Sequence, residues 1–259
     1  MTSFDINTTG DDVLKHFSKY AKGKTFVITG PSENGIGAES AITLASAKPQ
    51  KIILVGRTES KVISVIEAIR KINPDIEVFF VEIDLLNNKS VRQAAEKIKT
   101  LTDKIDVLIN NAGVMAVKYY ATSVDGVESQ FAANYLGHFL LTNLLDGETY
   151  NPWVAYGQAK TAMVLFNLAL DKRLKQKGVT ALICHPGGNP LPPQNMVTLK
   201  QAAGVVLFTA LNPSLPEAAP AFIVENEIYT ETKDYALNKE TAEGLWKLSE
   251  KLVGETFVY

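Results

Sequence analysis

The stretch VITGPSENGIGAES, residues 27–40, is the part of the sequence that decides the fold. A buried apolar run ends at Gly30, and a small-residue helical pattern follows Gly35 and Gly37. Glycines at such positions let the backbone turn tightly and approach a pyrophosphate, and the next helix offers free N–H groups and a positive dipole end. We therefore predict a dinucleotide-binding turn, with a plain strand-to-helix turn as the alternative.

Outward from this turn, short apolar runs alternate with amphipathic stretches. The expected strands are 24–30, 51–57, 76–85, 105–113, 179–186 and 221–226, and the expected helices are 37–47, 59–72, 90–101, 128–145, 153–176, 198–211 and 240–254. A short amphipathic helix around Val13 to Tyr20 precedes them, and we expect it to pack on the domain rather than on a membrane. This alternation implies right-handed βαβ units. We predict one α/β domain over residues 1–259, a Rossmann-like, doubly wound parallel sheet in a three-layer αβα arrangement.

Composition narrows the class of protein. A net charge of −2 argues against nucleic acid as a partner, and 46% hydrophobic content supports a sizeable core. The one cysteine, Cys184, is expected to be a buried strand thiol, which fits a reducing compartment. The N-terminus lacks the features of a signal peptide, and no apolar run approaches the ~20 residues of a membrane span. We expect a soluble, cytoplasmic protein without a metal, because His138 and His185 lack metal-ligand spacing.

The end of the second expected strand indicates which dinucleotide binds. An acidic residue there would accept a hydrogen bond from the ribose 2′-hydroxyl of NAD. The chain instead has Gly56-Arg57, with Lys61 one turn later. Cations suit a 2′-phosphate, so NADP (NADPH) is favoured over NAD. The alternative is that Arg57 is a solvated surface side chain.

Tyr156 and Lys160 form a Tyr-x-x-x-Lys pair in an expected helix. Side chains at i and i+4 share a helix face. A nearby ammonium favours tyrosinate, which moves the pKa of a phenol from ~10 towards neutrality. That shift suits a general acid/base. An isolated pair of this kind is more often an ordinary half-buried tyrosine beside a lysine.

Taken together, the motifs resemble the short-chain dehydrogenase/reductase family, and the stretch DGVESQFAANYLGHFLLTNLL is most similar to its retinol-dehydrogenase-like branch. The matching pieces cover nearly the whole chain: TGPSENGIG (29–37), the IDL of Asp84, NNAG (110–113), FAANYLGHFLLT (131–142), Tyr156-x-x-x-Lys160 and HPGG (185–188). The resemblance implies Tyr156 as general acid/base, Lys160 on the nicotinamide ribose and Asn134 holding a relay water. The cofactor-binding residues implied, besides this Tyr–Lys pair and Arg57, are Gly30, Ser32, Asn34, Gly35, Ile36 and Gly37 in the glycine turn, Asp84 and Leu85 at the adenine, Asn111, Ala112 and Gly113 at the adenosine ribose, and Pro186, Gly187 and Gly188 near the nicotinamide.

The chain departs from the family pattern in three places. The glycine turn has four residues, 31–34, where three are common. More severely, only DGETYNPWVA (146–155) separates Leu145 from Tyr156, where the family has a central strand followed by a catalytic serine. This polar segment reads as a loop, with Asn151 as helix N-cap and Pro152 at the first helical position. No central strand after residue 145 is evident, the serine is unlocated, and the substrate-covering segment after residue 188 is also short.

Two explanations compete for these departures. Either the sequence omits residues that the molecule contains, or the molecule lacks them. We favour the first, because a sheet without a central strand leaves costly unpaired backbone groups.

Three functions fit the sequence. The leading hypothesis is an NADP-dependent oxidoreductase that moves hydride between the nicotinamide and a small carbonyl or alcohol substrate. The others are a catalytically silent NADP(H)-binding protein and a non-redox enzyme of the same fold, such as a cyclase or isomerase. The family also suggests homo-oligomerisation through helices 128–145 and 153–176.

Overall fold

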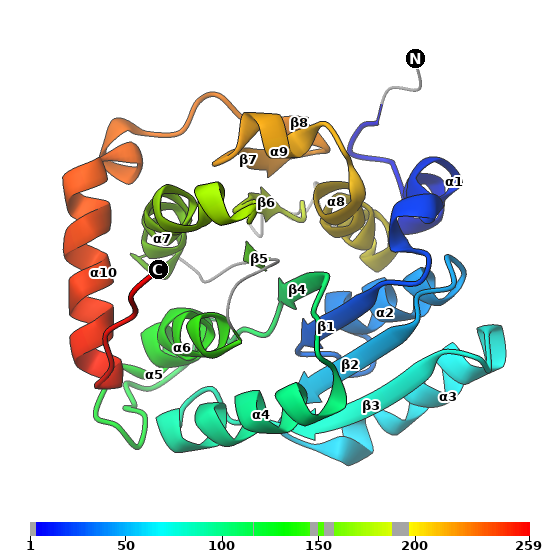
Figure 1. Ribbon diagram of the computed structural model, residues 1–259, viewed down its shortest axis with the longest axis horizontal. Coiled ribbons are helices and arrows are strands. Elements are labelled where there is room, and N and C mark those ends of the chain that lie inside the picture. Colours follow the sequence, from blue (N-terminus) through cyan, green and yellow to red (C-terminus); the bar gives the residue numbers. More distant parts are fainter. Residues whose placement is uncertain (1–3, 116, 146–149, 153–157, 188–196) are drawn as a thin grey trace.

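A parallel sheet forms the centre of the molecule (Figure 1). The computed structural model describes residues 4–115, 117–145, 150–152, 158–187 and 197–259, with the backbone alone for 150–152 and 158–161. The strand order of the main sheet is β3-β2-β1-β4-β5. Its strands are β1 (Thr25–Thr29), β2 (Lys51–Gly56), β3 (Glu77–Glu82), β4 (Val107–Asn110) and β5 (Tyr150–Pro152).

Side chains alternate across the sheet and divide the core into two parts. On β1, Val27 packs into one part, while Phe26 and Ile28 pack into the other. Helices α4 (Asn88–Leu101), α6 (Gly137–Leu144) and α7 (Gln158–Leu174) cover the first face. Helices α2 (Ile36–Ala45), α3 (Ile63–Ile72) and α8 (Leu199–Leu211) cover the second. The predicted three-layer, Rossmann-like αβα fold is confirmed.

The first helix, α1 (Gly10–Ala21), packs on α8, as predicted for the N-terminal amphipathic segment. Thr9 caps it, because its side chain accepts a hydrogen bond from the Asp12 N–H while the Asp12 carboxylate accepts one from the Thr9 N–H. Phe17 of α1 and Phe208 of α8 enclose the ring of Phe4, with centroid distances of 5.5 and 5.2 Å. The segment from Phe4 through α1 is thereby held against α8, in the second half of the chain (Figure 1).

A second, smaller sheet has the order β6-β7-β8. It consists of β6 (Ile183–His185), β7 (Phe222–Val224) and the antiparallel β8 (Glu227–Ile228). β6 lies next to β5, but the described strands are not hydrogen-bonded to each other there (Figure 1). The single sheet expected from the sequence is therefore interrupted between β5 and β6. The remaining short elements are η1 (Glu59–Lys61), η3 (Lys175–Lys177), α9 (Leu215–Ala218) and η5 (Asp234–Leu237).

β5 corrects one expectation from the sequence. Asn151 and Pro152 were expected to begin a helix, but both belong to this three-residue strand, in register with Ile109 and Asn110 of β4. The hydrogen bonds that the segment forms with the free edge of β4 outweigh the low strand propensity of its polar residues, because strand propensity depends strongly on context. A strand after residue 145 is therefore present, and α7 is described from Gln158, so the expected helix start at residue 153 lies outside the described residues.

The helix expected over 128–145 is divided into three pieces. α5 (Ser129–Phe131) and α6 flank a π-helical turn, η2 (Ala132–Leu136), in which the Gly137 N–H donates to the Ala132 carbonyl five residues earlier. π-helical turns are often found at functional sites. Gly137 also permits a close approach, because a Cβ there would lie 2.7 Å from the Leu85 carbonyl oxygen.

The last helix, α10 (Lys239–Val253), packs along α7 and contacts α6 through the side chain of Trp246. Trp246 stacks on Phe166 of α7 at 5.8 Å and meets Phe139 of α6 edge-on at 5.2 Å. Arg173 of α7 pairs with Glu243 through two hydrogen bonds of 2.8 and 2.9 Å, which holds the pKa of that carboxyl below its ordinary value. Self-association through the helices at 128–145 and 153–176 stays a prediction. Among the described helices, none is both long and apolar enough to cross a membrane.

Candidate functional site

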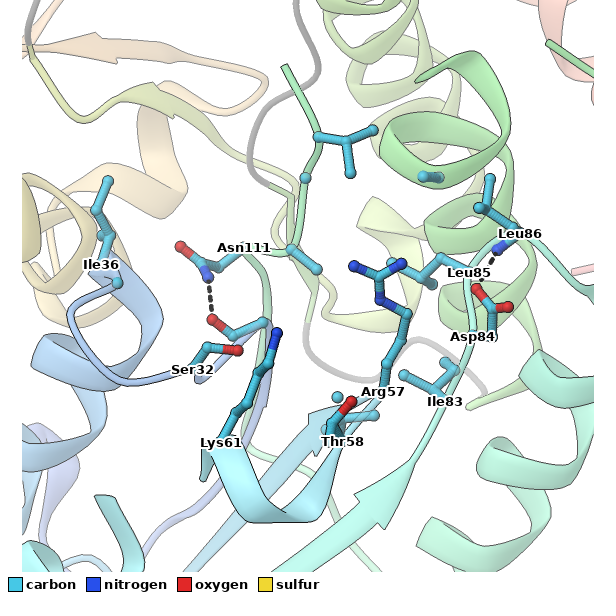
Figure 2. A pocket seen from close by; sticks show the side chains of 18 residues that line it. Ser32, Ile36, Arg57, Thr58, Lys61, Ile83, Asp84, Leu85, Leu86 and Asn111 are labelled. Atoms are coloured by element: carbon cyan, nitrogen blue, oxygen red, sulfur yellow. Dashed lines mark hydrogen bonds between the residues drawn. The ribbon is translucent and has the colours of Figure 1, made fainter. Parts of the chain in front are cut away.

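A pocket of about 610 Å³ opens at the carboxyl ends of β1, β2 and β4 (Figure 2). This is the edge at which parallel α/β sheets bind their ligands. Ten of the predicted cofactor residues line it: Gly30, Ser32, Gly35, Ile36, Arg57, Asp84, Leu85, Asn111, Ala112 and Gly113. Most of the residues predicted to bind the cofactor therefore lie around one cavity.

The glycine turn is packed tightly against the end of β4. Gly30 has φ +68°, and a Cβ on it would lie 2.7 Å from the Ala112 Cα. A Cβ on Gly37 would lie 2.5 Å from Asn111 Nδ2, so Gly37 supports the turn from behind rather than lining the pocket. Gly35 is the N-cap of α2 and provides no side-chain cap, which leaves the first N–H groups of the helix available to an anion.

The additional residue in the turn has a definite place. Asn34 adopts the left-handed conformation, with φ +60°, and it does not line the pocket. The preceding N–H, that of Glu33, donates to the Lys61 carbonyl over 3.1 Å. The longer turn is thus connected to η1, the segment that follows β2.

Arg57 and Lys61 place two cationic side chains at the wall of the pocket (Figure 2). Within the described part of the chain, no carboxylate forms an ion pair with either of them. Thr58, between them, adds a hydroxyl to the same wall. Unpaired cations beside a hydroxyl and backbone donors form a suitable environment for a phosphate.

Asp84 and Leu85 form another part of the wall, after β3. One carboxylate oxygen of Asp84 accepts the Leu86 N–H over 3.0 Å, and the Asp84 N–H donates to Ser90 Oγ over 2.9 Å. These bonds fix the aspartate at the strand end. Its second oxygen and the neighbouring apolar residues provide the kind of surface that a purine base requires.

The loop Asn111–Val114 follows β4 and is held at both ends. Asn111 Nδ2 donates to the carbonyls of Thr29 and Gly30 over 2.9 and 3.1 Å. At the other end, Val114 donates its N–H to Asn134 Oδ1 over 2.7 Å and accepts from Asn134 Nδ2 over 2.8 Å. The Asn134 side chain, expected to hold a relay water, is therefore engaged with the backbone, and Asn134 does not line the pocket.

The expected catalytic pair is only partly placed. Lys160 belongs to the first turns of α7, where the backbone alone is described, and Tyr156 lies outside the described residues, as does Gly188. Pro186 and Gly187 follow β6 and are not among the lining residues. Gly187 has φ +86°, and its N–H donates to His185 Nδ1.

Sequence reasoning missed two residues beneath the pocket, Thr29 and His138. Both are fully buried, and Thr29 Oγ1 lies 3.0 Å from His138 Nε2. Burial lowers the pKa of His138 to about 4, so the ring is neutral at physiological pH. A histidine in the apolar run GHFLL was an available signal, because a buried polar group requires a hydrogen-bond partner.

The sequence is similar to those of known oxidoreductases. Residues 24–149 match the short chain dehydrogenase family model. The oxidoreductase fscI of Fusarium equiseti is 32% identical, over 71% of this chain and 95% of the relative. Retinol dehydrogenase 12 of Mus musculus is also 32% identical, over 90% of this chain and 87% of the relative.

Solved structures support the fold. A short chain dehydrogenase from Burkholderia cenocepacia in complex with NADP matches 79% of this chain and 97% of its own, with 18% identity and a TM-score of 0.65. The NADH-dependent reductase A1-R′ complexed with NAD matches 81% of this chain and 97% of its own, with 18% identity and a TM-score of 0.67.

The alignment with fscI also measures how short this chain is. The alignment is 244 positions long but takes up 71% of the 259 residues, about 184. About sixty positions of the relative therefore have no counterpart in this chain.

Proposed function

The chain belongs to the short-chain dehydrogenase/reductase family, in its retinol-dehydrogenase-like branch, and on that premise we propose that it is an NADP-dependent oxidoreductase. It would transfer hydride between the nicotinamide and the carbonyl or alcohol carbon of a small molecule. The observation that carries the NADP preference is the pair of unpaired cations, Arg57 and Lys61, at the end of β2.

The residues present fit a dinucleotide. The N-terminus of α2 at Gly35, which has no side-chain cap, would bind the pyrophosphate. Gly30 lies close against Ala112 and has no side chain that would separate the backbone from the pyrophosphate. Arg57 and Lys61 would bind the 2′-phosphate, and Asp84 would accept a hydrogen bond from the adenine amino group. When bound, the cofactor supplies or accepts the hydride.

We assign the proton transfer that accompanies hydride transfer to the pair Tyr156 and Lys160. Tyr156 would donate it to the substrate oxygen during reduction and accept it during oxidation. Lys160 would hold the nicotinamide ribose and, as an ammonium, keep the pKa of the tyrosine low enough for that exchange. Because the Asn134 side chain is bound to Val114, we assign it to holding the cofactor loop, and a relay water would have to bind backbone groups.

We propose the cytoplasm as the location, because the single cysteine, Cys184, is a buried thiol in β6. We propose that self-association, where it occurs, uses the helices at 128–145 and 153–176.

The cofactor preference is tested by titrating the protein with NADPH and NADH. Removing a charge-assisted hydrogen bond costs about 1.5–3 kcal/mol, so Arg57→Ala should weaken NADPH binding roughly 10- to 100-fold. NADH binding should be nearly unchanged. Arg70→Ala, an exposed arginine on α3, is the matched control and should alter neither. Equal losses for both cofactors would contradict the assignment of the 2′-phosphate.

Turnover is tested separately, with NADPH consumption against a panel of carbonyl compounds. Tyr156→Phe should abolish turnover and preserve NADPH binding. Turnover that survives in this variant would exclude Tyr156 as the acid. Binding without turnover in the parent chain would instead favour the silent NADP(H)-binding protein. An intact mass of 28.3 kDa for the protein purified from its source would show that the molecule itself lacks the missing residues.

A further inference from the structure

A buried chain of hydrogen bonds lies beneath the loop Asn111–Val114 and connects its two ends. The Ala112 N–H donates to Thr29 Oγ1 over 2.9 Å. Thr29 Oγ1 lies 3.0 Å from His138 Nε2, and His138 Nδ1 lies 3.2 Å from the Asn134 carbonyl oxygen. The Asn134 side chain then binds both the N–H and the carbonyl of Val114.

The direction of each proton in this chain follows from the chemistry of the groups. The Asn134 carbonyl can only accept, so Nδ1 of His138 carries the proton. In the neutral ring Nε2 then accepts, and Thr29 must donate its hydroxyl proton to it. The alternative acceptor for that hydroxyl, the Ile109 carbonyl, is more distant, at 3.5 Å. The Thr29 oxygen is thereby left with its lone pairs directed to the Ala112 N–H.

We infer that His138 is a positioning residue, which fixes the loop Asn111–Val114 against the glycine turn so that the cofactor pocket is formed before the ligand binds. The inference rests on the proposed function only in naming NADPH as the ligand. Ala112 is in direct contact with Gly30, so a displacement of the loop changes the width of the pocket at the pyrophosphate turn. The His138 ring acts on both ends of the loop. It accepts a hydrogen bond from Thr29, which binds Ala112, and it donates one to the π-helical turn, whose Asn134 binds Val114.

The same role could not be filled by an apolar residue of similar volume. His138 and Thr29 are both 0% exposed, so an unmade hydrogen bond at either position is not replaced by solvent. His138→Leu would free the threonine hydroxyl to turn towards Ile109 while still accepting from Ala112. Thr29→Val would remove the acceptor of the Ala112 N–H altogether. We therefore expect the threonine substitution to have the larger effect.

Two measurements test the inference on the full chain. The first is hydrogen–deuterium exchange of the free protein over residues 111–114. The second is NADPH affinity by titration of NADPH fluorescence. His138→Leu should accelerate exchange in this loop and weaken NADPH binding roughly fivefold to tenfold, about the effect of one neutral buried hydrogen bond. Thr29→Val should do at least as much, and the double variant should be no worse than Thr29→Val alone, because the two residues act through one path.

Conservative variants and a control separate positioning from loss of packing. His138→Gln can still accept from the threonine, and Thr29→Ser keeps the hydroxyl, so both should bind NADPH within about twofold of the parent. Tyr135→Phe removes another buried hydrogen bond of the same π-helical turn, the 2.7 Å contact with Ser249, without touching the chain below the loop. It should leave loop exchange and NADPH affinity unchanged.

Additive losses in the double variant, or equal weakening by Tyr135→Phe, would overturn the inference. Unchanged exchange over residues 111–114 in His138→Leu would do the same. If the parent chain does not bind NADPH, the proposed function fails, but the exchange measurement still decides the role of His138.

Discussion

Acidification should destabilise this protein through His138 in particular. The folded state holds the ring neutral, with its pKa lowered from 6.5 to about 4 because the ring is completely buried. The unfolded chain exposes the ring, which takes up a proton below about pH 6.5. Between these two values the unfolded state binds more protons, so the free energy of unfolding falls as the pH falls through this window.

The size of the effect follows from the two pKa values. At pH 5 the unfolded imidazole is almost fully protonated, whereas the folded one is about 10% protonated. The linkage relation then gives a loss of about 2 kcal/mol between pH 8 and pH 5 from this one residue. That loss is a substantial fraction of the 5–15 kcal/mol typical of a folded domain.

The measurement is urea unfolding at pH 8 and pH 5, for the parent and for His138→Gln. The variant cannot titrate at this position, so groups common to both proteins cancel in the comparison. Asp12, Asp106 and Glu243, whose pKa values are lowered by hydrogen bonds from cationic side chains and the backbone, are among these groups. The parent should lose about 2 kcal/mol more than the variant on acidification, with equal urea slopes. The same pH dependence in both proteins would refute the reasoning.

Three substitutions test other packing arguments. Gly37→Ala should weaken NADPH binding at least roughly tenfold, because its Cβ would lie 2.5 Å from the amide nitrogen of Asn111, and NADPH titration measures this. Gly204→Ala should lower the free energy of unfolding by about 1–3 kcal/mol and expose α1 to limited proteolysis, because its Cβ would lie 2.3 Å from the Thr8 carbonyl oxygen. Arg173→Lys should cost about 1 kcal/mol in thermal unfolding, because a lysine cannot form the two parallel hydrogen bonds to its glutamate partner or cover the indole ring 4.1 Å away.

The first half of the fold could be predicted well from the sequence, for a local reason. The apolar runs that became β1, β2 and β4 are mostly buried on both faces, and the edge strand β3 keeps an apolar centre between two exposed glutamates, so composition alone identifies all four. The residues of the cofactor pocket follow these strands directly, at positions set by the parallel sheet. Glycines and cations at the strand ends indicated Gly30, Gly35, Arg57 and Lys61 without any tertiary information, and the resemblance to the family added Asp84, Leu85 and the loop after β4.

The second half could not be predicted in the same way, because its structure depends on distant partners. β5 is polar and was expected to be a loop, and it is a strand only because β4 offers a free edge. The π-helical turn keeps the apolar periodicity of an ordinary helix, so the sequence pattern does not reveal it. The hydrogen bonds between Asn134 and Val114 join residues twenty positions apart, and nothing in the local pattern distinguishes them from a solvated asparagine.

The packing of α10 on α6 and α7 has a consequence for how the protein responds to dilution. Aromatic surface that could otherwise be buried between two molecules is here buried within one, through Trp246, Phe139 and Phe166. Exposing this aromatic surface on unfolding therefore does not require two molecules to separate. The stability that this face contributes should therefore be the same at every protein concentration, for a chain present at a few copies per cell as for one that is abundant.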